Sequence, residues 1–291
     1  MIDLVAQSLF SGLLSGAYYA LIALGLALVF GTMRVINLAH GELVLLGAYI
    51  SYTAEEKLGL DPLASLPLAL LVVIATNMVV YYLISLIKKD RELNSLILTF
   101  GIGVILTNAM LMIWSADIHS ATTPWYHDAV ILADTLFAMQ AELVFAGVGV
   151  ALVGAVWWWL EKTWYGRALR AIASNRDAAK LMGVNPQMTE ILSFAVAGLL
   201  ATFSGLAIYT AKVIQPSLGH HLTVKAFIIT VLAGMGSVPG VLLGAVLLGV
   251  VESLTVTIAS SALQELAGMV LFLLVLLLMP SGLFGRAKRR G

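Results

Sequence analysis

Four polar side chains interrupt an apolar stretch near the start of the chain. Arg34, Asn37, His40 and Glu42 lie within the segment FGTMRVINLAHGE, residues 30–42. Uncharged apolar residues precede and follow this segment, so the polar groups fall where a membrane helix would otherwise continue. Lipid cannot satisfy loose polar groups, and such a break must therefore face protein or a water-filled cavity. Transporters place their pathways at discontinuous helices of this kind.

The break has two interpretations. It is either a short cytoplasmic turn, with Arg34 following the charge bias of such turns, or a segment that borders a translocation path, which we favour. An isolated charge inside a span costs at least about 2.5–3.5 kcal/mol, so each one is expected to be paired, to snorkel or to face water. For Glu42 the nearest partners in the sequence are Arg34 and His40. Lys225 and Glu252 raise the same question near the other end of the chain.

Enzymatic chemistry finds little support in the sequence. There is no GxxxxGK[ST] phosphate loop, no HExxH zinc motif and no GxSxG nucleophile motif. The chain has no cysteine, which excludes thiolate sites, and its five histidines are too scattered to predict a metal site. Hydrolysis within the membrane could use Ser204, Ser237 and His40, but helix packing explains the serines better. We predict no catalytic residue, no metal and no cofactor.

Composition places the chain in the membrane. Hydrophobic residues make up 60% of it and charged residues 11%, with mean hydropathy +0.99, whereas soluble domains carry about 25% charged residues. The net charge is zero, which gives no reason to expect nucleic-acid binding. The N-terminus lacks the positive region of a secretory signal, so the first apolar run is interpreted as an uncleaved span. We predict an all-α polytopic membrane protein with one domain, residues 1–291.

Spanning the bilayer needs about 20 apolar residues per helix. Two runs, 224–233 and 241–254, are shorter and flank the glycine-rich GMGSVPG, which predicts a hairpin or re-entrant pair. Residues 40–50 resemble 239–249, which suggests a weak parallel repeat or a chance likeness of glycine-rich helices. In all we expect about 8–9 hydrophobic segments: 8–30, 42–53, 66–87, 94–114, 142–160, 191–211, 224–233, 241–254 and 263–279.

Basic residues predict the orientation. Twelve of the sixteen Lys and Arg residues fall in 88–91, 162–180 and 286–290, which we place in the cytoplasm. The loop 115–141 has no Lys or Arg and is expected outside. Counting crossings then puts the N-terminus outside and the C-terminus inside.

The basic stretch 161–190 contains the signals of a short helix. Ser174 or Asn175 can cap it, and Asp177 suits its first turn. Gly183 suits a left-handed end, and Pro186 prevents continuation. Such a helix would dock in a partner's groove or lie on anionic lipid, and the spacing leaves both open.

Four stretches resemble the permease subunits of branched-chain amino acid ABC transporters. The likeness extends over about residues 10–286. The stretches are GTMRVINLAHGELVLLGAYI from residue 31, GRALRAIASNRDAAKLMGVN from 166, LTVKAFIITVLAGMGSVPGVLLGAVLLGVVESL from 222, and LLLMPSGLFGR from 276.

The resemblance implies an importer of the bacterial inner membrane with separate partners. These are two ABC ATPase subunits that handle the ATP, a second permease or a second copy of this chain, and a substrate-binding protein. It also implies that the cytoplasmic loop couples to the ATPases, and it favours placing both broken segments near the path. The coupling residues are then Ser174, Asn175, Arg176, Asp177, Ala178, Ala179, Leu181, Met182 and Gly183. The candidate path residues are Asn37, His40, Glu42, Thr99, Asn108, Gly234, Gly236 and Ser237.

The implied substrate is a branched-chain or other hydrophobic amino acid, although the family includes urea and short-chain amide permeases. We expect a path lined mainly by apolar and small side chains for the former, and use of Asn37, Thr99 and Asn108 for the latter. An ion-coupled carrier is the rival class. It would need buried carboxylates, and only Glu42 and Glu252 offer them, each near the end of an apolar run.

Overall fold

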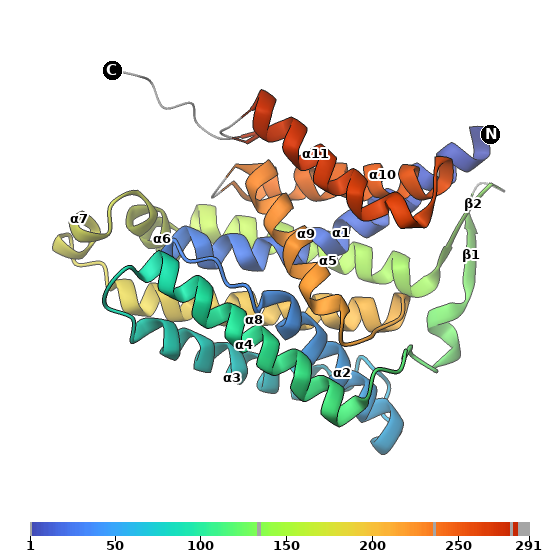
Figure 1. Cartoon of the computed structure of the whole chain (residues 1–291), viewed down its shortest axis with the longest axis horizontal. Helices are drawn as coiled ribbons and strands as arrows, with labels where there is room; N and C mark the ends of the chain where they lie inside the picture. The colour runs from blue at the N-terminus through green and yellow to red at the C-terminus, as the bar shows by residue number, and fades with distance from the viewer. Residues whose placement is uncertain (1, 133–134, 235–236, 280–281, 285–291) are drawn as a thin grey trace.

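The structure, a computed structural model, describes the chain except residues 1, 133–134, 235–236, 280–281 and 285–291 (Figure 1). The described residues form α-helices, two 3-10 helices (η) and one two-stranded sheet. In chain order these are α1 (Ile2–Met33), α2 (His40–Leu58), α3 (Leu66–Ser85), α4 (Arg91–Trp114), η1 (Pro124–His127), β1 (Ala129–Leu132), β2 (Leu136–Met139), α5 (Gln140–Lys162), α6 (Trp164–Ser174), α7 (Arg176–Leu181), α8 (Pro186–Ala211), α9 (Leu218–Ala233), α10 (Val238–Ile258), η2 (Ser261–Leu263) and α11 (Gln264–Leu278).

Seven segments of the described chain are long and apolar enough to cross a membrane. They are α1, α3, α4, α5, α8, α10 and η2 with α11. The shorter apolar α9 and the partly polar α2 bring the hydrophobic segments to the predicted range. The all-α polytopic membrane fold is therefore confirmed.

The bundle is elongated, with α7 at one end and the β1–β2 hairpin at the other (Figure 1). We call these the α7 end and the hairpin end. α1 is largely enclosed by α5, α8, α9 and α10. Glycine allows the closest of these approaches, because a Cβ built on Gly12 would lie 2.6 Å from the Val250 Cα of α10. By contrast α4 and α11 leave most of their apolar side chains exposed, which suits contact with lipid or a partner helix.

The predicted pair near residue 234 is a hairpin, but its arms are longer than expected. α9 begins at Leu218 rather than at 224, and α10 is a full-length helix from Val238 to Ile258. The segment GMGSVPG predicts Pro239 and Gly240 as part of the break. Proline is tolerated in the first helical turn, and the Ser237 hydroxyl accepts a hydrogen bond from the Gly240 N–H at 3.2 Å, so the helix starts there. The two stretches of the possible repeat thus begin α2 and α10.

The long loop before α5 is ordered by pairing. β1 and β2 form an antiparallel hairpin in which Ala129 faces Met139 and Leu132 faces Leu136. His119 forms an isolated bridge with Ile214, which fastens this loop to the one between α8 and α9.

Candidate translocation path and coupling helix

The break between α1 and α2 covers residues 34–39 and is fastened to α4. Its backbone turns at Arg34, where φ is +54°. The Asn37 side-chain oxygen accepts a hydrogen bond from the Ala39 N–H at 3.1 Å, and Thr99 Oγ1 of α4 accepts one from the Leu38 N–H at 3.1 Å. Asn37 and Thr99 are both fully buried. The structure therefore brings them together as parts that shape the break.

His40 packs the start of α2 against α1. Its Nε2 lies 3.0 Å from the Ile22 carbonyl oxygen, a separation that suits a donated hydrogen bond. The imidazole fits because α1 has a glycine there, since a Cβ on Gly25 would lie 2.8 Å from His40 Cε1. His40 is almost completely buried, so its contacts are with protein and not with an open path.

Glu42 finds its partner on α9. Thr223 Oγ1 accepts a hydrogen bond from the Gly41 N–H at 2.8 Å and lies 3.4 Å from Glu42 Oε2. Glu42 is expected to have a cationic or donor partner, and the Thr223 hydroxyl is such a donor. The nearest candidates in the sequence, Arg34 and His40, contact other groups instead. Arg34 is separated from α2 by the break and reaches the Ala173 carbonyl oxygen at 3.5 Å. The Glu42 side chain, in the first turn of α2, therefore points towards α9.

Two cavities border the break. One of about 510 Å³ is lined by Arg34, Ile36 and Glu92 among others. The second, of about 260 Å³, is lined by Glu42, Asn108, His220 and neighbouring apolar residues of α4. Asn108 is thus placed beside Glu42, although its amide also donates to the Val104 carbonyl at 2.7 Å.

The second break lies at a different depth. Gly234, with φ +81°, ends α9, and Ser237 begins the turn into α10. Eleven residues of helix separate Thr223 from Gly234, or about 16 Å at 1.5 Å per residue. Gly234 and Ser237 therefore do not join the cluster around Glu42. Gly236 lies outside the described residues.

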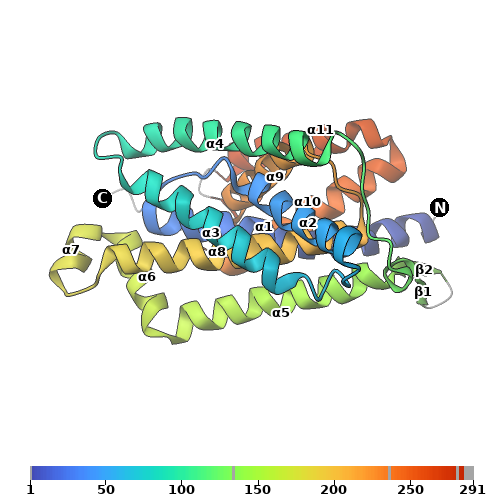
Figure 2. The ribbon, with the colours of Figure 1, turned by 90° about the horizontal axis from the view of Figure 1, so that it is seen from below.

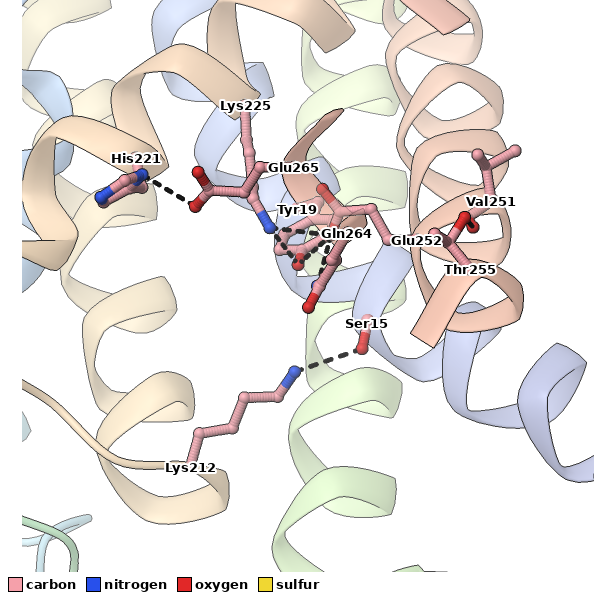
Figure 3. Close-up of polar contacts among 10 residues, drawn as sticks. All are labelled: Ser15, Tyr19, Lys212, His221, Lys225, Val251, Glu252, Thr255, Gln264 and Glu265. Carbon is pink, nitrogen blue, oxygen red and sulfur yellow. Dashed lines mark hydrogen bonds and ion pairs between the residues drawn. The ribbon is translucent and has the colours of Figure 1, made fainter. Parts of the chain in front are cut away.

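A polar cluster near the hairpin end joins four helices (Figure 3). Lys225 Nζ lies 2.7 Å from Glu252 Oε2 and 3.0 Å from Tyr19 Oη. Tyr19 and Gln264 both donate to the same carboxylate, at 2.8 and 2.9 Å. Lys212 Nζ lies 3.3 Å from Ser15 Oγ. Sequence reasoning singled out the two charges on α9 and α10 but missed Tyr19, Lys212 and Gln264, which carry no motif.

The predicted short helix is present as α7. Asn175, rather than Ser174, caps it by accepting a hydrogen bond from the Ala178 N–H at 3.0 Å. Gly183 follows with φ +84°, as its position predicted. Leu181 and Met182 are 88% and 85% exposed, whereas Ala179 is buried within the chain. The apolar surface that α7 offers a partner is therefore Leu181 and Met182.

Glu190 connects α7 with two longer helices, a role that sequence reasoning missed. Its carboxylate, on α8, lies 2.7 Å from Arg176 Nη2 of α7 and 3.7 Å from Arg91 Nη2 of α4. The Glu190 side chain is almost completely buried, which strengthens its interaction with both guanidinium groups. A displacement of α7 would therefore be transmitted to α8 and α4.

Glu55 anchors the loop at the hairpin end. It lies in the polar last turn of α2 and accepts hydrogen bonds from Thr122, Thr123 and Tyr209. Burial alone would raise the pKa of the Glu55 carboxyl, but the hydrogen bonds from Tyr209, Thr122 and Thr123 outweigh it, and the pKa lies below its usual range. The loop is thereby fixed to an ionised carboxylate.

Comparison with known proteins extends over nearly the whole chain. Residues 8–279 match the family described as "Branched-chain amino acid transport system / permease component". The high-affinity branched-chain amino acid transport system permease protein BraD of Pseudomonas aeruginosa is 31% identical over 97% of this chain and 96% of its own. The corresponding protein LivH of Escherichia coli is 30% identical over the same shares. The fructose import permease protein FruF of Bifidobacterium longum is 26% identical over 89% of this chain and 73% of its own.

One solved structure shares the fold. It is described as PsaBC from Streptococcus pneumoniae in complex with Fab, and one of its chains aligns with a TM-score of 0.54 over 94% of this chain and 92% of its own. The sequence identity is 12%, so the likeness concerns the arrangement of helices alone.

Proposed function

Since the chain belongs to the family of branched-chain amino acid transport permeases, we propose that it is the membrane-spanning permease subunit of an ABC importer for branched-chain amino acids. The match over residues 8–279, reinforced by relatives of about 30% identity along their full length, is the observation that carries this function. We find nothing in the comparisons that favours a urea or amide permease or an ion-coupled carrier.

The proposed importer needs partner chains. The relatives are named as permease proteins of transport systems, which supports separate ATPase and binding-protein subunits. We propose two ATPases, a second permease or a second copy of this chain, and one substrate-binding protein. ATP is hydrolysed on the ATPases, and this chain does no covalent chemistry and needs no cofactor.

We place the α7 end in the cytoplasm of a bacterial cell and the hairpin end outside its inner membrane. Lys88 and Lys89 lie between α3 and α4, Arg91 begins α4, and Arg167 and Arg170 lie on α6. The α3–α4 loop, the start of α4 and α6, which carry these basic residues, lie near the α7 end (Figures 1 and 2), and cytoplasmic loops are rich in such residues. The N-terminus is then outside, and α11 runs towards the inside.

We propose that α7 is the coupling helix. Leu181 and Met182 would fill an apolar groove on an ATPase, because two such exposed side chains at the end of a capped helix are suited to groove binding. The Arg176–Glu190–Arg91 cluster would then carry the movement of α7 into α8 and α4.

The translocation path would follow the cavities beside the break. Asn37, Thr99 and His40 hold the break in shape, and Glu42 and Asn108 border the cavity. Gly234 and Ser237 form the turn between α9 and α10. Closure of the ATPases on ATP shifts the permease between its outward and inward states, because ATP binds the closed state better.

Purification from native membranes tests this function. A tagged chain should bring down two ABC ATPases and a permease, and the binding protein encoded with them should bind leucine, isoleucine or valine. Recovery of the chain without any ATPase would contradict the proposal. A binding protein that binds only urea or an amide would support the importer function but contradict the proposed branched-chain amino acid substrate.

A further inference from the structure

A cavity opens at the hairpin end between α1, α8, α9 and the start of α11. Its volume of about 510 Å³ lies within the range of small-molecule sites, about 300–1,000 Å³. Its lining combines charged groups with an apolar wall. The wall includes Ile208, Val213, Leu218 and Leu222.

The lining of this cavity includes a cation without a carboxylate partner. In the described part of the chain, the ion pairs within 4.0 Å do not include Lys212. The Lys212 ammonium donates a hydrogen bond to the Ser15 hydroxyl, with 3.3 Å between Nζ and Oγ (Figure 3). Lys225, which also lines the cavity, is already paired with Glu252 at 2.7 Å. Lys212 is therefore the cation that remains for an anion.

The same lining includes a carboxylate that is only partly engaged. Glu265, at the start of α11, lies with Oε1 2.8 Å from His221 Nδ1. Its side chain is 50% exposed, and it lines the same cavity as Lys212. The second oxygen of Glu265 can accept hydrogen bonds from an ammonium group, which has three to donate.

A free α-amino acid presents the complementary groups. Its carboxylate seeks a cation and hydroxyl donors, its ammonium seeks a carboxylate, and charge-assisted hydrogen bonds are the strong ones. A branched apolar side chain gains by burial against the wall. Resting on the proposed function, we propose that this cavity is a substrate site of the permease, where Lys212 holds the carboxylate and Glu265 the ammonium of an amino acid. The substrate would thus pause on charged groups at the outer mouth before it meets the apolar path.

Photolabelling tests the site in the complete importer, held in lipid nanodiscs without binding protein. The probe is a leucine analogue with a diazirine in its side chain, and mass spectrometry maps its adducts. Adducts should fall on the apolar wall, at Ile208, Val213 or Leu222. Leucine should compete, but leucinamide and 4-methylpentanoate, each lacking one charge, should not.

Matched variants distinguish loss of the proposed binding contacts from a general loss of folding. Lys212→Gln and Glu265→Gln should each lower labelling at least about tenfold, the loss expected for one charge-assisted hydrogen bond. Lys212→Arg keeps the charge and should restore labelling. Lys57→Gln neutralises another lysine at the hairpin end and should change nothing. Labelling away from the cavity, equal labelling of Lys212→Gln, or full competition by 4-methylpentanoate would each overturn the site.

ATP-driven leucine uptake by the same importer, with binding protein added, separates the two proposals. Uptake without cavity labelling leaves the importer function standing and removes the site. Labelling that needs Lys212, without leucine uptake, keeps the site and contradicts the transport function.

Discussion

Lys225 of α9 and Glu252 of α10 form an ion pair with 2.7 Å between Nζ and Oε2. Their side chains are 15% and 3% exposed, and Tyr19 and Gln264 complete the bonds to the carboxylate. Twenty-seven residues separate the two charges in the sequence. The pair therefore fixes how α9, α10, α1 and α11 meet near the hairpin end.

Replacing one member of this pair should lower the stability of the folded chain more than replacing both. Glu252→Leu should destabilise the folded chain by about 3–5 kcal/mol, because it leaves the largely buried Lys225 charge without a carboxylate. Lys225→Met combined with Glu252→Leu should recover much of that loss. Thermal unfolding of the purified complex measures both. Additive losses in the double variant would show that the two charges do not interact.

Leu181→Asp should uncouple transport without unfolding the chain. The side chain is exposed here, and only in a complex would the new charge be buried against the ATPase. Uptake and transport-stimulated ATPase activity should fall at least about tenfold, equivalent to 1.4 kcal/mol, while membrane insertion stays normal. Leu181→Met is the matched control.

The buried Ala179 of the same helix should respond differently to the same charge. Ala179→Asp places a carboxylate inside the chain, so it should lower stability as well as transport. For the preceding variant, Leu181→Asp, normal leucine uptake would show that α7 does not lie at the ATPase interface.

Glu190→Gln should weaken coupling by releasing Arg176 and Arg91. We expect ATP hydrolysis to continue in the assembled importer while leucine uptake per ATP falls, since α7 would move without carrying α8 and α4. Glu161→Gln is the control, because its pair with Arg170 is half exposed and exposed pairs contribute little. An unchanged ratio of uptake to hydrolysis in Glu190→Gln would contradict this role.

Single cysteines can establish the orientation, because the chain has none of its own. Ser217→Cys, in the exposed loop before α9, should react with a membrane-impermeant maleimide in intact cells. Lys180→Cys, on the exposed side of α7, should react only after permeabilisation. The opposite pattern would reverse the placement of the two ends.

The sequence predicted the features that depend on local chemistry. Hydropathy predicted the membrane helices, and Asn175 and Gly183 predicted where α7 begins and ends, because caps and left-handed positions are set by neighbouring residues. The polar residues inside an apolar run predicted a break over residues 30–42, and the structure confines it to 34–39, because α1 continues to Met33 and α2 begins at His40. These signals are all contained within a few residues.

Contacts between distant helices could not be predicted in this way. The partner of Glu42 is Thr223, which lies 181 residues further along the chain. The nearest candidates in the sequence, Arg34 and His40, contact the Ala173 and Ile22 carbonyl oxygens instead, because nearness in sequence does not mean nearness in space. Glu190 and Lys212 belong to no motif, and their roles follow only from how α4, α7, α8 and α9 are packed.

The central claim is that ATP on partner subunits drives import of branched-chain amino acids through this chain. Its most direct test is uptake of radiolabelled leucine by right-side-out membrane vesicles that contain the assembled importer, with the binding protein outside. We predict that uptake requires ATP inside the vesicles, persists when ionophores collapse the ion gradients, and is competed by isoleucine and valine. Uptake that continues without ATP and stops with the ionophores would show an ion-coupled carrier and contradict this account.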